Sequence, residues 1–233
     1  MNLDIVEGFI EIKGQHPVLV TATHGFGSDG YRAVAKALRK CLKHFYVKTG
    51  YPSEHLGIVA RYGSAVDLFT WEIAYKIAVH ENVWSVLPTL SKIDSVDGMT
   101  IPDYNLNKGY ASVTPFWRRV RDIVAREGIR VVIDLHGMKN IKKWPDICIS
   151  TRGMSTASTE LVSMLRSYFA KHGLRVEIDY PFAGGAFISH MGKPPHVEAV
   201  AIEIKRNLRF FGSRIPEILR GAITVVKHHL SPK

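Results

Sequence analysis

Apolar positions along the chain change repeatedly between a strand-like and a helix-like spacing. Short β-rich apolar runs predict strands or extended segments, and apolar residues spaced three and four apart predict amphipathic helices between them. The expected strands lie at residues 17–25, 83–90, 129–137, 146–151 and 174–182, and residues 199–209 form a strand leading into the last helix. The expected helices lie at residues 28–45, 64–80, 113–128, 155–173 and 216–230.

This alternation predicts an α/β fold with three α/β/α layers and a mixed, largely parallel central sheet. No Gly/Ser-rich linker, charge block or internal repeat divides the chain, so residues 1–233 are interpreted as a single domain. Ligand sites in such sheets form beyond the carboxyl ends of the strands. Three residues are expected there, namely His24, His136 and Glu203.

Composition adds expectations about the compartment and excludes some classes of protein. The only two cysteines, Cys41 and Cys148, have no CxxC spacing, which argues against a disulfide framework or a thiolate zinc cluster. No apolar run approaches the roughly 20 residues that span a bilayer. The acidic N-terminus lacks the basic start of a signal peptide. We therefore expect a soluble, cytoplasmic protein without membrane contact.

The formal net charge of +10 permits binding to nucleic acid or another polyanion. The basic residues are dispersed, however, and no zinc-finger or RNP-type motif accompanies them. Nucleic acid is therefore not favoured as a partner, whereas a small anionic substrate suits the basic charge.

Two histidines, His24 and His136, each stand near the end of an expected strand and each precede a glycine. Neutral imidazoles together with a carboxylate are a common ligand set for catalytic zinc. Asp134 shares a strand face with His136 and is expected to orient an imidazole or cap backbone amides. The third ligand stays open between Asp67, at the start of a helix, and Asp29; Glu72 is a weaker option on the helix surface.

Glu203 lies inside an apolar run that predicts a buried strand. A buried Glu is rare unless it is paired or functional. Two interpretations stay open: a general base, or an ion pair with Lys205 or Arg206. The segment 179–196 is interpreted as a loop outside the hydrophobic core, either a surface hairpin or a loop whose glycines, Gly184 and Gly185, let backbone approach a substrate.

Six motifs follow one another in an order that resembles the N-formylglutamate amidohydrolase family: "VTATHG", "IPDYNLN", "VVIDLHGMK", "DICISTRGMS", "YPFAGGAFISHMG" and "HVEAVAIEIKRNLR". The resemblance covers residues 18–209. It implies a zinc-carboxypeptidase-like fold and a single zinc ion per chain.

The resemblance also implies roles for individual residues. His24, Asp67 and His136 would be metal ligands, Glu203 the general base, and Asn105 a substrate contact. The family's "DLNR" segment is "DYNLN" here, so that Leu106 replaces the Arg that could bind a substrate carboxylate. Arg152 is a candidate replacement, and Arg206 is a further candidate.

The leading functional prediction is a zinc-dependent hydrolase of an amide bond in an N-acyl amino acid or a related small carboxylate. Two alternatives remain. The first is a basic polyanion-binding protein on a hydrolase-like scaffold, since a fold does not fix a function. The second is a metal-binding but catalytically silent relative. The substrate itself and the oligomeric state do not follow from the sequence.

Overall fold

The computed structural model describes residues 4–6, 9–25, 67, 69–89, 95–96, 99–100, 112, 114–209 and 212–230. The strands are β1 (Asp4–Val6), β2 (Phe9–Ile12), β3 (His16–Thr21), β4 (Val83–Pro88), β5 (Ser95–Val96), β6 (Met99–Thr100), β7 (Val131–Met138), β8 (Ile147–Ser150), β9 (Val176–Ile178) and β10 (Glu198–Lys205). The helices are α4 (Thr70–Glu81), α5 (Pro115–Arg126), α6 (Thr159–Lys171), α7 (Ala186–Met191) and α8 (Ile215–Leu230), with a 3-10 helix η2 (Arg206–Arg209).

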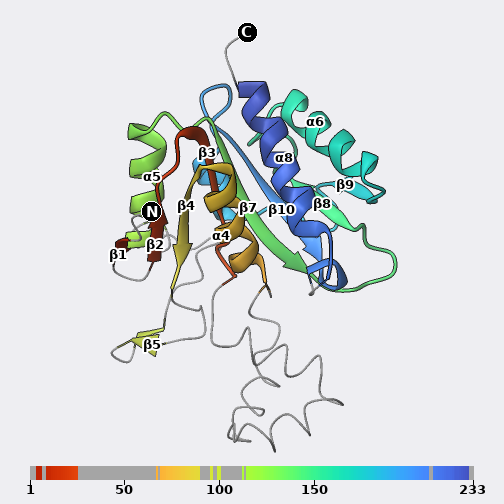
Figure 1. Ribbon diagram of the computed structural model, residues 1–233, viewed down its shortest axis with the longest axis horizontal. Coiled ribbons are helices and arrows are strands. Elements are labelled where there is room, and N and C mark those ends of the chain that lie inside the picture. The colour runs from red at the N-terminus through yellow and green to blue at the C-terminus, as the bar shows by residue number, and fades with distance from the viewer. Residues whose placement is uncertain are drawn as a thin grey trace, which may run out of the picture.

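A mixed sheet of eight strands runs through the described residues in the order β1-β2-β4-β3-β7-β10-β8-β9 (Figure 1). Its four central strands, β4, β3, β7 and β10, are parallel to one another. On either side of them, β2 pairs antiparallel with β4, and β8 pairs antiparallel with β10. The predicted mixed, largely parallel sheet is therefore confirmed, and β5 and β6 form a separate pair.

Helices cover both faces of the sheet, as Figure 1 shows. Because side chains alternate along a strand, Ile133 and Leu135 of β7 enter the core cluster shared with α4, α6 and α8. Val132 of the same strand belongs to the second cluster, which contains residues of α5 and α7. This arrangement confirms the predicted three layers.

The face that packs on α5 and α7 becomes polar toward the carboxyl ends of its strands. In β7 it continues from Val132 to Asp134 and His136, and in β10 from Ala201 to Glu203. All three polar residues are buried. Buried polar and ionisable groups are costly unless they are paired or functional, which marks this edge of the sheet as the candidate site.

Helices α5 and α6 each begin directly after a residue whose side chain caps the helix N-terminus. Thr114 accepts a hydrogen bond from the Trp117 amide at the start of α5, at 3.4 Å. Ser158 caps α6 in the same way through the Leu161 amide, at 3.1 Å. The helix predicted from residue 155 therefore begins at residue 159, because the cap lies inside the predicted segment.

The helix predicted at residues 64–80 begins later as well, at Thr70. Phe69 precedes it in a left-handed conformation, with φ 65°. The helix predicted at residues 28–45 lies outside the described residues.

The prediction that residues 179–196 lie outside the hydrophobic core is wrong. This segment contains α7, whose Phe187, Ile188 and Met191 are buried against α5 and the sheet. Phe187 contacts Trp117 edge-on, with ring centroids 5.5 Å apart. The sequence prediction failed because six residues are too few to show a helical period beside two glycines. Among the described residues, no helix combines the length and apolar character needed to cross a bilayer.

Candidate metal centre

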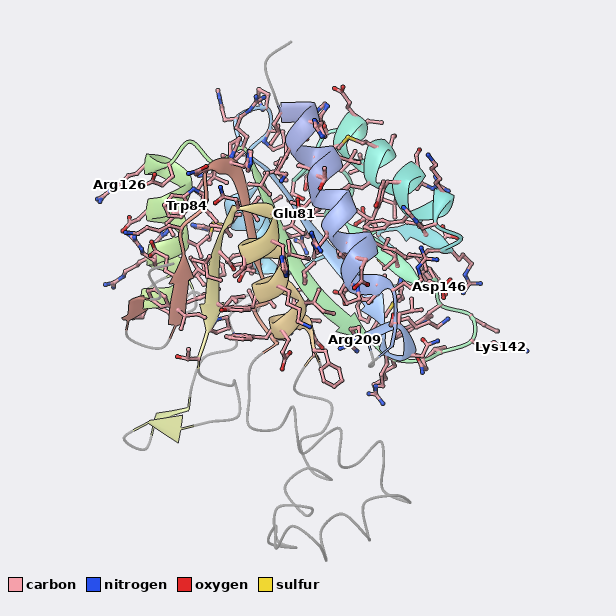
Figure 2. The ribbon with its side chains drawn as sticks, in the orientation of Figure 1. Glu81, Trp84, Arg126, Lys142, Asp146 and Arg209 are labelled. Carbon is pink, nitrogen blue, oxygen red and sulfur yellow. The ribbon has the colours of Figure 1, made fainter. Side chains whose placement is uncertain are left out.

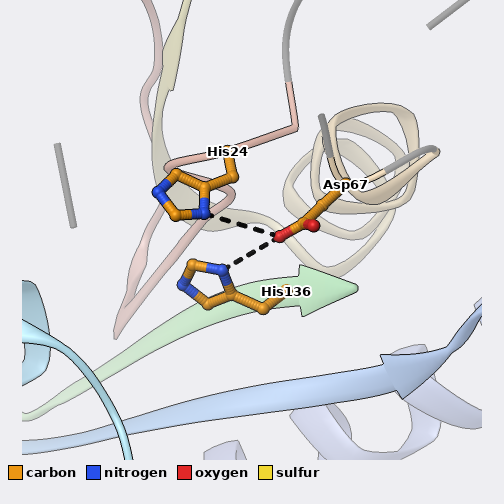
Figure 3. A group of neighbouring side chains, drawn as sticks. All are labelled: His24, Asp67 and His136. Atoms are coloured by element: carbon orange, nitrogen blue, oxygen red, sulfur yellow. Dashed lines mark hydrogen bonds and ion pairs between the residues drawn. The ribbon is translucent and has the colours of Figure 1, made fainter. Parts of the chain in front are cut away.

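Three side chains from distant parts of the sequence meet at the carboxyl edge of the sheet (Figure 3). One carboxylate oxygen, Asp67 Oδ2, lies 3.1 Å from His136 Nδ1 and 3.7 Å from His24 Nδ1. The two imidazole rings stand edge to face, with centroids 4.9 Å apart. The structure therefore brings together the three residues that the family resemblance implied as metal ligands.

Backbone hydrogen bonds hold these three residues close to one another. His24 lies in the turn that follows β3, where the Gly25 amide donates to the Ala22 carbonyl at 3.0 Å. The Asp67 amide donates to the His24 carbonyl, also at 3.0 Å. His136 reaches the same place on β7, which runs parallel to β3. His24 and Asp67 are thus linked by a backbone hydrogen bond as well as by the contact between their side chains.

The glycine after His24 is required by close packing. A Cβ atom at Gly25 would lie 2.6 Å from both Thr70 Oγ1 and the Trp71 amide nitrogen, at the start of α4. The absence of a side chain lets the turn carrying His24 approach α4, just after Asp67. The room that Gly25 leaves is therefore filled by the start of α4.

Asp134 holds His136 from the opposite side. Its Oδ2 atom lies 2.8 Å from His136 Nε2. Both of its carboxylate oxygens also accept hydrogen bonds from Thr23, one from the amide and one from the hydroxyl, each at 3.0 Å. Asp134 is completely buried, so its position is fixed. With the Nε2 proton donated to Asp134, Nδ1 is the atom of His136 that would ligate a metal ion, on the side of Asp67.

Neighbouring charges strongly shift the pKa values of Asp67 and His136. Burial opposes ionisation of Asp67, but the hydrogen bond from His136 and the charges of His24, His136 and Arg209 lower its pKa to about 2. Burial likewise opposes protonation of His136, yet Asp134, Glu203 and Asp67 raise the pKa of this imidazole well above 6.5. Without a metal, the His136 imidazole therefore carries a second proton, and its positive charge lies between two carboxylates. A bound metal cation would supply positive charge at the same place.

The donor set fits a divalent metal ion. His24, Asp67 and His136 each offer one ligand atom, and these atoms lie within 4.8 Å of one another. Two imidazoles and one carboxylate are a ligand set known for catalytic zinc, which keeps a fourth position for water. Asp134 supplies the outer carboxylate that usually orients a ligating histidine. Glu72, the weaker candidate, is exposed on α4, and Asp29 lies outside the described residues.

Glu203 lies beside this group on the neighbouring strand. It is paired in register with His136, because β10 runs parallel to β7, and it is 8% exposed. Burial raises the pKa of Glu203 to about 7; the charge of His136 opposes this shift, and Asp67 and Asp134 support it. A carboxyl group of this pKa can both take and return a proton near neutral pH.

The alternative that Glu203 forms an ion pair with Lys205 finds no support in the described part of the chain. Lys205 Nζ lies 3.6 Å from Asp146 Oδ1 and donates to the Trp144 carbonyl at 3.1 Å. Among the same residues no ion pair joins Glu203 to Arg206 either, so the structure does not support the interpretation of Glu203 as an ion-pair partner of these two basic neighbours.

The predicted substrate-binding residues lie in different parts of the structure. Arg152 is exposed, and its Nη1 atom lies 3.5 Å from the Gly184 carbonyl, so these two residues do meet. Gly185 precedes α7. Arg206 belongs to η2, directly after the strand of Glu203. Asn105 lies outside the described residues.

The turn that carries Arg152 is held in an unusual conformation. Arg152 and Met154 have positive φ angles of 55° and 64°. The Asp179 carboxylate accepts hydrogen bonds from the amides of Thr151 and Gly153, at 2.6 and 2.8 Å. The exposed Arg152 side chain is therefore attached to a turn whose backbone is held in place by Asp179.

One residue near the site was missed by the sequence analysis. Arg209, at the end of η2, is only 6% exposed, and its guanidinium lies against the backbone of Gly137, next to His136. Figure 2 labels it at the lower end of the sheet. A signal was present in "KRNLR", where Arg209 follows Arg206 by three residues, directly after a buried strand. Such a spacing places both arginines on one side of a 3-10 helix.

Comparisons with known proteins agree with the predicted resemblance. The sequence model of the N-formylglutamate amidohydrolase family matches residues 114–209, which include His136 and Glu203. The match confirms the resemblance over that segment, to a family of amidohydrolases. No curated protein gives a sequence match.

Solved structures extend the likeness to nearly the whole fold. N-formylglutamate amidohydrolase from Ralstonia eutropha superposes with a TM-score of 0.63 at 11% identity, covering 97% of this chain and 99% of the other. A gene product of Agrobacterium tumefaciens gives a TM-score of 0.60 at 16% identity, covering 94% and 95% of the two chains. At these identities the likeness establishes a shared fold.

Proposed function

We propose that the protein is a zinc-dependent hydrolase that cleaves an amide bond in an N-acyl amino acid or a related small carboxylate. The observation that carries the proposal is the convergence of His24, Asp67 and His136 beside the buried Glu203. The match to an amidohydrolase family over residues 114–209 supports the same class of reaction.

Three residues are assigned as metal ligands, and a fourth orients one of them. His24 Nδ1, Asp67 Oδ2 and His136 Nδ1 would hold the ion, and Asp134 keeps His136 in the required tautomer. When bound, zinc supplies a Lewis acid and lowers the pKa of water toward about 7. Burial of Asp134 and His136 excludes bulk solvent from one side of the site.

Glu203 is assigned the proton transfers. With a pKa of about 7, its carboxylate accepts the proton of the attacking water, and the resulting carboxylic acid delivers that proton to the leaving nitrogen. The same burial that raises the pKa also strengthens the interaction with a developing charge. General acid–base catalysis of this kind typically contributes about 10²- to 10⁴-fold.

Substrate positioning is assigned to the groups around the edge of the site. Gly184 and Gly185 are the candidates for backbone that approaches the substrate, and Arg152, Arg206 and Asn105 are the candidates for binding a substrate carboxylate or amide. A small anionic substrate also suits the net charge of +10. The cytoplasmic location stays a prediction from the two cysteines.

The decisive experiment is elemental analysis of the purified wild type beside His136→Ala. We expect about one zinc per wild-type chain and none in the variant, because His136 supplies a ligand that no other described residue replaces. His80→Ala, which removes an exposed histidine of α4, is the matched control and should keep its zinc. A wild type that binds no divalent metal would refute the proposal.

Zinc binding alone does not establish an amidohydrolase. A screen of N-formyl and N-acetyl amino acids, with release of the free amine as the readout, then tests the reaction itself. Hydrolysis of one of these compounds by the zinc-loaded wild type, but not by His136→Ala, is the expected result.

A further inference from the structure

Exposed apolar side chains gather in two neighbouring segments of the chain. Within the part that the structure describes, the large apolar side chains that are exposed are those of Ile141, Tyr180 and Phe182. They belong to the loop that joins β7 to β8, where Figure 2 labels Lys142, and to the segment between β9 and α7. The two segments meet where the Trp144 ring lies edge-on to the Phe182 ring, with centroids 5.2 Å apart. Single exposed apolar residues are ordinary, whereas a group of them marks a binding surface.

The backbone of Phe182 lies over strand β8, next to the strand of Glu203. Its carbonyl accepts hydrogen bonds from the Ser150 hydroxyl at 2.7 Å and from the Cys148 thiol at 3.2 Å. Cys148 is paired in register with Glu203, because β8 runs antiparallel beside β10. Side chains paired in this way point to the same face of a sheet. Phe182 therefore lies over the face to which the Glu203 side chain belongs, one strand away from it.

Trp144 is held at the carboxyl end of the strand that carries Glu203. Lys205 Nζ donates to the Trp144 carbonyl at 3.1 Å, and the Arg175 guanidinium donates to the same oxygen. Lys205 follows Glu203 by two residues, so alternation along β10 puts both side chains on one face. Trp144 and Phe182, here named the aromatic pair, therefore flank Glu203 on the side of β8.

Glu203 lies between the metal centre and the aromatic pair. The sheet order β7-β10-β8 places His136 on one side of Glu203 and Cys148 on the other. In the proposed reaction Glu203 gives a proton to the leaving nitrogen, so this nitrogen must come within hydrogen-bond distance of the carboxyl group. The amino-acid half of the substrate begins at that nitrogen. It would therefore extend away from the metal ligands, toward β8 and the aromatic pair.

We propose that the aromatic pair forms the subsite for the side chain of the released amino acid, and that the protein prefers N-acyl derivatives of aromatic or large apolar amino acids. This inference rests on the proposed function and deepens it. Aromatic side chains bind apolar groups by removing both surfaces from water, and contact between rings adds to this attraction. The sequence agrees, since Leu106 replaces an arginine that in the resembled family could bind a substrate carboxylate.

The subsite is tested by binding to the Glu203→Gln protein saturated with zinc, in which turnover does not interfere. Isothermal titration compares N-acetyl-L-phenylalanine with N-acetyl-L-alanine and N-acetyl-L-glutamate, which share the amide and the α-carboxylate. Because the phenyl ring would be buried against the aromatic pair, we expect the phenylalanine compound to bind about 10- to 100-fold more tightly than the alanine compound. The glutamate compound should bind no more tightly than the alanine compound.

Removal of the aromatic pair should remove the preference. Trp144→Ala and Phe182→Ala should each lower it at least about threefold, and the double variant should abolish it, with the affinity for N-acetyl-L-alanine unchanged. Tyr168→Ala is the matched control, because Tyr168 is a partly buried aromatic residue of α6, which packs on the other face of the sheet. It should keep the full preference. Thermal unfolding shows whether each variant is folded.

A conservative variant adds an optical readout of direct contact. Trp144→Phe keeps an aromatic ring and should keep the preference for the phenylalanine compound. The change in tryptophan fluorescence that accompanies binding of this compound should fall, because the indole nearest to the ligand is absent. A fluorescence change as large as that of the parent protein would mean that the phenyl ring binds elsewhere, which contradicts the subsite.

Several outcomes would overturn the proposal. They are equal affinities for the phenylalanine and alanine compounds, tightest binding of the glutamate compound, a preference that survives in the double variant, and no measurable binding of any compound. If the double variant does not fold, an unchanged preference in both single variants contradicts the subsite. Zinc content and hydrolysis of other N-acyl amino acids by the wild type are read separately, so the proposed function can stand while the subsite fails.

Discussion

At the scale of single residues, His136 shows how the site is built from paired charges. Its two ring nitrogens face two different carboxylates, Asp67 at 3.1 Å and Asp134 at 2.8 Å. Only Asp67 belongs to the proposed ligand set, and Asp134 is completely buried and bonded to Thr23. The two carboxylates therefore have different tasks although they contact the same ring.

Asp134→Asn tests the orienting task. The amide keeps the shape of the side chain but removes the charge that fixes the His136 tautomer, so we expect zinc affinity to fall about 10- to 100-fold. Competition with a chelator of known affinity measures the change. Asp146→Asn, which alters a partly exposed ion pair with Lys205, is the control and should bind zinc like the wild type. Equal affinities in the two variants would contradict the assignment.

Glu203→Gln tests the proton transfers. An amide cannot accept the proton of water, so we expect kcat to fall about 10²- to 10⁴-fold. Zinc content should remain at the wild-type level, because Glu203 is not among the three ligands. This pair of measurements also separates an enzyme from a catalytically silent metal-binding relative, in which the substitution would change neither quantity.

At the scale of elements, the position of α4 matters because Asp67 lies just before it. The far end of α4 is tied to α8 by Glu81, which is 8% exposed. The Glu81 carboxylate accepts hydrogen bonds from Lys227 at 2.8 Å, Thr224 at 2.9 Å and Arg220 at 3.2 Å. One side chain thus joins the two helices that share a face of the sheet.

Glu81→Gln should lower the free energy of unfolding by about 2 kcal/mol, because three donors lose a charged acceptor. Burial raises the pKa of Glu81, but its hydrogen bonds from Lys227, Thr224 and Arg220 outweigh burial and hold the pKa below the ordinary 4.5. The stabilisation is therefore fully present above about pH 4.5 and is lost as the pH falls through the folded-state pKa. Urea unfolding across a pH series measures both effects.

The control for this series is Glu177→Gln, since Glu177 is exposed on β9. It should change stability little at any pH. If the difference between wild type and Glu81→Gln stayed constant from neutral to strongly acidic pH, the charge of Glu81 would not be its source.

At the scale of the whole molecule, the metal ligands come from three regions of the chain. His24 follows β3, Asp67 precedes α4, and His136 lies on β7. The same sheet contains strands from residue 4 to residue 205, and α8 packs on it near the C-terminus. We propose on this ground that residues 1–233 form a single domain. A metal bound at the site would join segments more than 100 residues apart.

Metal removal should therefore destabilise the folded protein. With free zinc at about 1,000 times its Kd, binding to the folded state alone adds about 4 kcal/mol to the free energy of unfolding. Addition of a chelator should lower the Tm of the wild type and leave the Tm of His136→Ala unchanged. Calorimetry of both proteins with and without chelator makes the comparison. An equal response of the two proteins would mean that the chelator acts elsewhere.

The sequence by itself determined the features that depend on near neighbours. Alternation along a strand places Asp134 and His136 on one face, and the structure confirms this. The helix predicted at residues 113–128, from its apolar spacing and the proline near its first turn, is present at Pro115–Arg126. These features depend on contacts within a few residues, so a short stretch of sequence contains the necessary information.

Only the tertiary structure decided which distant residues meet. The sequence left Asp67 and Asp29 open, and a backbone hydrogen bond to His24 now places Asp67 in the site. It gave no role to Arg209, whose position depends on the contact of η2 with Gly137. The order of strands in a sheet is fixed by packing between segments far apart in the chain. Local patterns of apolar and polar residues do not contain that order, because each pattern records only the face that its own segment buries.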